Sequence, residues 1–131
     1  MSDSAKRALV AGHAGFAAGM ISAVQQITGR GDVLVPVMVK DLCGDDIQKV
    51  LHDTMVETGA RVIFTDLHAG SCTMAARRVL RQIGDGVLVA GINLPMLLDF
   101  ALSTNPSAAE AATTAAERGR TSVSVHSGAP A

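Results

Sequence analysis

Three side chains in this sequence have the types and spacing to do chemistry together: His13, Asp66 and Ser71. An imidazole is a nucleophile or a base near neutral pH. A carboxylate that accepts the proton of its Nδ1 fixes the tautomer and leaves Nε2 free. A serine at a helix start lies beside unbonded backbone N–H groups, here those of residues 71–73, which favour an anion and above all a phosphoryl group. This combination suits phosphoryl transfer through a phosphohistidine.

The pattern of apolar residues indicates which elements hold these side chains. Short apolar runs at residues 8–11, 33–39, 61–65 and 87–91 predict four strands, and Pro36 favours an edge position or a bulge for the second of them. Apolar residues at intervals of three to four predict helices between these strands, and two further helices at about 93–102 and 107–120. We expect Asp45 and Ser71 to cap the second and third helices.

Strands that alternate with helices predict an α/β fold, a doubly wound and mainly parallel sheet of four strands with helices on both faces. Residues 121–125 form either a fifth strand or part of a tail. The chain of 131 residues is expected to form one domain, with its core at about residues 7–120. Because ligands of such folds bind beyond the carboxyl ends of the strands, His13, the turn at 66–71 and Asn93 should converge on one crevice.

Composition excludes some classes of function. The net charge is −1 and only 2% of the residues are aromatic, so the chain lacks the basic and stacking surfaces of nucleic-acid binding. It shows no signal peptide and no apolar run of roughly 20 residues, which leads us to expect a cytoplasmic protein. In that compartment Cys43 and Cys72 should stay reduced.

Three stretches of the chain together resemble a known family. They are Gly12-His13-Ala-Gly-Phe-Ala-Ala-Gly-Met20, Phe64-Thr-Asp66-Leu-His-Ala-Gly70-Ser71 and Val89-Ala-Gly-Ile-Asn93-Leu-Pro-Met96-Leu. In order and spacing, over about residues 7–120, they are similar to the enzyme IIA components of the mannose-family sugar phosphotransferase system (mannose, fructose, sorbose and N-acetylgalactosamine).

The resemblance implies a phosphotransferase that needs no bound cofactor. His13 would take a phosphoryl group from the phosphocarrier protein HPr and pass it to an enzyme IIB component during sugar uptake, with Asp66 supporting the ring. It further implies a homodimer, a fifth strand that is exchanged between subunits, and membrane contact only through the transporter complex. We expect the backbone at Gly70, Ser71 and Cys72 to bind the phosphoryl group. The rim that partner proteins contact is expected to consist of Phe16, His68, Asn93 and Met96.

The chain departs from the family pattern Asp-x-x-Gly-Gly-Ser-Pro. Ala69 replaces a glycine, Cys72 replaces the proline, and His68 stands at an often aromatic position. Ala69 narrows the conformational freedom of the backbone, and His68 adds a second imidazole near the first. These departures bear on the choice of partner and sugar more than on the basic chemistry.

Other functions share these residues. The phosphoryl-transfer subunit of a dihydroxyacetone kinase and a regulatory phosphoprotein that passes nothing on would both use His13. A hydrolase would use Ser71 as nucleophile, but Ser71 lacks the Gly-x-Ser-x-Gly elbow. A metal site at Asp66, His68 and Cys72 matches no tight zinc spacing, and we expect none.

Overall fold

The computed structural model describes residues 5–129 and contains one sheet of four parallel strands. The strands are β1 (Ala8–Ala11), β2 (Leu34–Val37), β3 (Val62–Thr65) and β4 (Val87–Ala90), in the order β2-β1-β3-β4. Ala11 pairs with Val37 and Thr65, and Thr65 with Ala90, so all four strands end level with one another. The residues that follow them therefore lie along one edge of the sheet.

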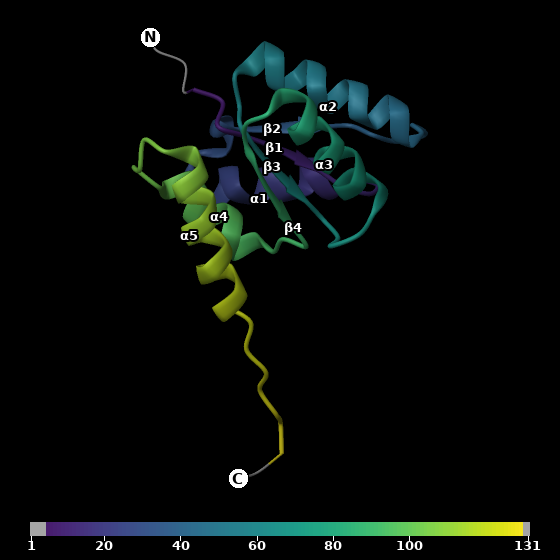
Figure 1. Ribbon diagram of the computed structural model, residues 1–131. Coiled ribbons are helices and arrows are strands. Elements are labelled where there is room, and N and C mark those ends of the chain that lie inside the picture. The colour runs from purple at the N-terminus through teal and green to yellow at the C-terminus, as the bar shows by residue number, and fades with distance from the viewer. Residues whose placement is uncertain (1–4, 130–131) are drawn as a thin grey trace.

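Helices cover both faces of this sheet (Figure 1). One face is covered by α1 (Phe16–Thr28), α4 (Leu94–Leu102) and α5 (Ala108–Thr121), and the other by α2 (Gly44–Thr58) and α3 (Ser71–Ile83). A short 3₁₀ turn, η1 (Gly31–Val33), leads into β2. The doubly wound α/β fold predicted from the sequence is confirmed. No helix formed by residues 5–129 is long and apolar enough to span a membrane.

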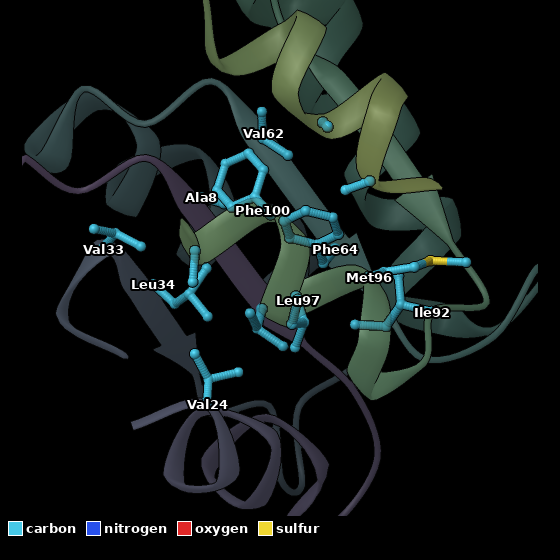
Figure 2. Packing of buried hydrophobic residues seen from close by; sticks show 14 of the residues in the cluster. Ala8, Val24, Val33, Leu34, Val62, Phe64, Ile92, Met96, Leu97 and Phe100 are labelled. Atoms are coloured by element: carbon cyan, nitrogen blue, oxygen red, sulfur yellow. The ribbon is translucent and has the colours of Figure 1, made fainter. Parts of the chain in front are cut away.

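The larger core lies between the sheet and the α1, α4 and α5 layer (Figure 2). Phe64 of β3 and Phe100 of α4 meet there edge to face, with ring centroids 5.0 Å apart. Both rings are fully buried, and each such side chain contributes about 1.5–3 kcal/mol of transfer free energy. This packing anchors β3, which carries Asp66 at its carboxyl end.

The element boundaries differ from the sequence prediction in a few places. Val33 belongs to η1, so β2 is shorter than the predicted strand, but β2 is an edge strand as Pro36 suggested. The predicted caps were wrong by one or two positions. Cys43, not Asp45, precedes α2, and Gly70, not Ser71, precedes α3. Ser71 instead opens α3, because the extended backbone of Gly70 occupies the cap position.

The chain after α5 adds no strand within the described residues. Residues 122–128 leave the end of α5 as an extended and exposed segment that points away from the domain (Figure 1). Val123 and Val125 in this segment are 72% and 94% exposed. Strand β4 lies at the edge of the sheet, and all four of its residues are only half-buried. Of the two structures expected for residues 121–125, a fifth strand or part of a tail, the described residues after α5 form the tail.

Candidate functional site

His13 lies two residues beyond the end of β1, on the turn that leads into α1. The turn is tight: the N–H of Phe16 donates to the carbonyl oxygen of His13 at 3.0 Å, and Ala14 takes a left-handed conformation with a φ of 48°. This geometry lifts the imidazole out of the sheet edge, so the His13 side chain is 60% exposed. A group carried by another protein can therefore reach it.

Asp66 directly follows β3, the neighbour of β1, and faces His13. Its Oδ2 lies 2.8 Å from Nδ1 of His13 and also accepts a hydrogen bond of 2.8 Å from the His13 backbone N–H. With Nδ1–H as the donor, the ring has a free lone pair on Nε2. Burial of the carboxyl, whose side chain is 10% exposed, acts to raise its pKa, but the hydrogen bonds from His13 outweigh this and lower the pKa of Asp66 below its ordinary value. Asp66 is thus a carboxylate near neutral pH.

Gly12 leaves room for the Asp66 carboxyl to lie against the His13 ring. A Cβ at this position would lie 2.7 Å from Cδ2 of Phe16 and 2.9 Å from Cγ of Asp66, distances that real Cβ atoms essentially never show. A larger residue would push the carboxyl away from the ring. Phe16, which we expected on the partner rim, is half-buried here and closes the site on the side of α1.

The turn between Asp66 and α3 is braced by a threonine that sequence reasoning missed. Thr73 is 2% exposed; its hydroxyl donates to the carbonyl oxygen of Leu67 and lies 2.6 Å from the hydroxyl of Thr65. Since Thr73 has one hydroxyl proton, Thr65 is the donor between the two. The sequence does contain a signal for this contact, because Thr65 and Thr73 are polar residues in otherwise apolar, buried elements on either side of the turn.

The start of α3 lies against the imidazole. A Cβ on Gly70 would come within 3.4 Å of Cε1 of His13, the ring carbon between the two nitrogens. The first helical hydrogen bond joins the N–H of Met74 to the carbonyl oxygen of Gly70, which leaves the N–H groups of residues 71–73 outside the helical ladder. Together with the exposed Ser71, these N–H groups give this end of α3 the features that the sequence analysis expected to favour an anion.

Cys72, the second residue of α3, presents no side chain at the surface. Its side chain is 1% exposed and packs between α3 and the sheet. Burial raises the pKa of the thiol, and the negative charge of Asp66 adds to this, so the thiol stays protonated. Cys43 and Cys72 are both free.

The remaining rim residues divide between surface and interior. His68 is exposed on the turn after β3. Asn93 caps α4 by accepting from the N–H of Met96 at 3.2 Å, and its amide nitrogen donates to the carbonyl oxygen of Gly119 in α5 at 2.9 Å. Met96 is 8% exposed and belongs to the core (Figure 2), so the structure does not place it on a partner-facing rim. Its burial follows from the close packing of α5 on α4 at Gly119.

This geometry supports a metal site less than it supports phosphoryl transfer. Within the described part of the chain, no group of three or more His, Cys, Asp or Glu side chains is placed to hold a metal ion. His13 donates toward the Asp66 carboxylate through Nδ1, and its side chain is 60% exposed. The arrangement can therefore hold a nucleophilic nitrogen, orient it and bind an anion next to it.

Comparison with known proteins agrees with this chemistry. Residues 7–117 match the family model described as the phosphotransferase system fructose IIA component. A comparison with curated protein sequences finds no significant match.

Solved structures share the fold. A mannose/sorbose specific IIA subunit of the phosphotransferase system from Enterococcus faecalis has a TM-score of 0.80 and 19% identity over 98% of this chain and 99% of that chain. A phosphotransferase system IIA protein associated with the fucose utilization operon of Streptococcus pneumoniae has a TM-score of 0.72 and 19% identity over 95% and 96%. A sigma-54 interaction domain protein from Enterococcus faecalis has a TM-score of 0.69 and 12% identity over 88% and 90%. At these identities the likeness shows the fold, and the family model shows the family. The chain therefore belongs to the fructose- and mannose-type IIA components, the phosphoryl carriers of the sugar phosphotransferase system.

Proposed function

We propose that Nε2 of His13 accepts a phosphoryl group from the phosphohistidine of HPr and passes it to an enzyme IIB component. The observation that carries this proposal is the 2.8 Å contact between Nδ1 of His13 and Oδ2 of the buried Asp66. It holds the ring with its proton on Nδ1 and directs the lone pair of Nε2 outward. The 60% exposure of the ring suits a donor and an acceptor that are both proteins.

The transfer conserves charge and electrons at the two rings. The Nε2 lone pair of His13 attacks phosphorus, a new N–P bond forms, and the N–P bond of the donor breaks with its electron pair returning to the donor nitrogen. The His13 ring then gains positive character, which the Asp66 carboxylate stabilises through the Nδ1 hydrogen bond. In the transfer to the IIB component His13 is the donor: the N–P bond at Nε2 breaks as the new bond to the acceptor forms, and the electron pair returns to Nε2.

The start of α3 holds the phosphoryl oxygens in this proposal. The N–H groups of residues 71–73, the hydroxyl of Ser71 and the positive end of the helix dipole all favour an anion beside the Cε1 edge of the ring. The phosphoryl chain begins with phosphoenolpyruvate, so the protein would act in the cytoplasm and meet the membrane only through the transporter complex.

Intact mass after incubation with phosphoenolpyruvate, enzyme I and HPr tests this function. The wild type should gain one phosphoryl group that is lost in acid and retained in base, as expected of a phosphoramidate. His13→Ala should gain none. His52→Ala is the matched control, because this imidazole lies on α2 and contacts Asp53 rather than Asp66, so its removal should leave the gain intact. A gain that persists in His13→Ala, or that vanishes in His52→Ala, would contradict the assignment.

Asp66→Asn tests the supporting role. The amide oxygen can still accept from His13, but it carries no charge to stabilise the phosphorylated ring. We expect phosphoryl uptake to slow about 10- to 100-fold, by analogy with the loss of a carboxylate that orients a metal-bound histidine. Quench-flow uptake from phosphorylated HPr measures the rate, and an unchanged rate would remove Asp66 from the mechanism.

A regulatory phosphoprotein is the second candidate, because the fold is shared with a sigma-54 interaction domain protein. Such a protein would be phosphorylated on His13 and pass nothing on. Chasing the phosphorylated protein with the IIB component and sugar separates the two functions. Loss of the phosphoryl group with formation of sugar phosphate supports the carrier, while retention supports the regulator.

We also infer a homodimer. The outer edge of β4 has unpaired backbone groups among the described residues, and the extended segment 122–128 carries exposed Val123 and Val125. Such a segment can add to the β4 edge of a second copy. Light scattering should give twice the chain mass for the full chain and a monomer for a chain that ends at Thr121. A full chain that stays monomeric would contradict the dimer.

A further inference from the structure

The backbone on both sides of Asp66 is held by one buried hydroxyl. Thr73, in the first turn of α3, donates its hydroxyl proton to the carbonyl oxygen of Leu67, which follows Asp66. The same hydroxyl accepts from Thr65, which precedes Asp66, with the two oxygens 2.6 Å apart. Thr65 and Thr73 are 0% and 2% exposed, so the bond between them is shielded from water. A single side chain thus bridges the residues before and after Asp66.

The two ends of this bridge differ in what else holds them. The carbonyl oxygen of Thr65 also accepts from the N–H groups of Gly91 at 3.0 Å and Ile92 at 3.2 Å, directly after β4. The side chain of Leu67 is 52% exposed, so its burial contributes little to holding the turn. The position of Leu67 therefore depends on the hydroxyl of Thr73.

The Asp66 carboxylate depends on this backbone support. Within residues 5–129, its Oδ1 is buried and has no hydrogen-bond partner. Its Oδ2 accepts two hydrogen bonds, but both come from His13, the residue that it orients. Because these bonds would persist if the carboxylate and the ring shifted together, they do not by themselves fix where the pair lies. The place of the pair relative to α3 is set by the backbone of Asp66, which Thr73 holds on both sides.

Packing alone does not require a threonine at position 73. Valine has the same shape and would fill the space without the cost of burying a hydroxyl. Thr73 also contributes one of the three backbone N–H groups that lie outside the helical ladder at the start of α3. One residue therefore connects the turn that carries Asp66 to the helix end proposed to hold the phosphoryl oxygens.

We propose that Thr73 is a positioning residue for phosphoryl transfer: its hydroxyl holds the turn at Asp66 against the start of α3, so that the carboxylate meets Nδ1 of His13. This rests on the proposed carrier function. The hydroxyl is engaged by Thr65 and Leu67, so it acts through Asp66 and not by binding the reacting group. Without it the carboxylate leaves Nδ1 part of the time. The ring then populates the tautomer with its proton on Nε2, which has no lone pair there to attack phosphorus.

The tautomer of His13 is the first readout, because a purely structural role of Thr73 would not change it. Nitrogen-15 NMR of the unphosphorylated protein at about pH 8.5, where an imidazole is neutral, distinguishes Nδ1–H from Nε2–H. The wild type and Thr73→Ser, which keeps the hydroxyl, should show the Nδ1–H form. Thr73→Val should show a mixture of the two forms. A Thr73→Val spectrum that matches the wild type in this respect overturns the proposal.

Single-turnover phosphoryl uptake from phosphorylated HPr is the second readout. Thr73→Val should lower the limiting rate constant roughly tenfold, because the reacting ring is misplaced, and leave the half-saturating HPr concentration unchanged. Thr73→Ser should restore the limiting rate constant. A serine variant as slow as the valine variant, or a change confined to the half-saturating concentration, overturns the proposal. A wild type that gains no phosphoryl group refutes the carrier function, whereas the tautomer measurement needs no phosphorylation and still tests the positioning role.

Two further variants separate positioning from stability. Thr65→Val combined with Thr73→Val replaces the buried hydroxyl pair by an apolar pair, which should recover the stability to urea that Thr73→Val loses by leaving the Thr65 hydroxyl unpaired. Uptake should stay slow, since the Leu67 carbonyl still lacks its donor, and a rate that recovers together with stability overturns the proposal. Thr54→Val is the matched control. Thr54 donates its hydroxyl to the carbonyl oxygen of Val50 within α2 at 2.6 Å, and its loss should change neither the tautomer nor the rate.

Discussion

A single oxygen of Asp66 binds His13 twice. Oδ2 accepts from the Nδ1 side of the ring and from the backbone N–H of the same residue, each at 2.8 Å. The backbone hydrogen bond sets the direction in which the chain leaves β1, and the ring contact sets the tautomer. One carboxylate thus couples the path of the turn to the protonation of the imidazole.

Asp66 should make the stability of the protein depend on pH. Its pKa in the folded protein lies below the ordinary value of about 3.9. The carboxylate therefore stabilises the fold above the unfolded pKa, and this contribution is lost as the pH falls through the lower folded pKa. Urea unfolding of the wild type and Asp66→Asn should differ at neutral pH and converge below about pH 4. Asp85→Asn, at a side chain that is 79% exposed, is the control and should show little difference at any pH. A constant gap for Asp66→Asn would contradict the lowered pKa.

Gly12→Ala should disturb both the fold and the reaction. The added Cβ would overlap Phe16 and Asp66, and forced repacking of this kind costs about 1–3 kcal/mol of unfolding free energy. Displacing the Asp66 carboxyl from the His13 ring should also slow phosphoryl uptake. Gly15→Ala is matched to it, because a Cβ at Gly15 meets no atom within 4 Å and its φ of −86° suits alanine. Equal stability and uptake rates in the two variants would show that the close approach at Gly12 is unimportant.

Gly119→Ala should separate α5 from α4. Its Cβ would lie 1.9 Å from Cγ of Met96 and 2.8 Å from Oδ1 of Asn93, so the cap of α4 and the contact between the helices must both shift. We expect a loss of about 1–3 kcal/mol in thermal or urea unfolding. Gly19→Ala within α1 meets no atom within 4 Å and should instead gain about 0.5–1 kcal/mol from helix propensity. The same sign for both variants would contradict this packing.

The two cysteines should differ in reactivity. Cys43 is exposed, whereas Cys72 is 1% exposed and burial raises the pKa of its thiol. Iodoacetamide at mildly alkaline pH should therefore label Cys43 in the native protein and leave Cys72 unmodified, as peptide mass mapping would show. Unfolding in urea should expose both. Labelling of Cys72 at the rate of Cys43 in the native state would mean that the start of α3 opens readily.

Much of the fold followed from local patterns. The glycines at 29, 59 and 84 end three helices in left-handed conformations, which glycine adopts readily, and Pro36 lies in an edge strand, as predicted. The predicted caps failed because a cap depends on the backbone angles of one residue. Cys43 and Gly70 take the extended conformation that precedes a helix, and neither forms a side-chain capping hydrogen bond. Met74 is exposed, since it lies on the outer face of α3 while its neighbours Ala75 and Ala76 face the sheet.

By itself the sequence determined the order of strands and helices, the strand-end positions of His13 and Asp66, and the motifs that mark the family, because these depend on hydrophobic period and on residues close along the chain. The tertiary structure alone decided that β1 lies beside β3, which brings together residues 53 positions apart and lets one Asp66 oxygen bind His13 twice. It also decided that Asn93 and Met96 hold α5 against α4. Such contacts arise from how separate elements pack, and no single stretch of sequence encodes that packing.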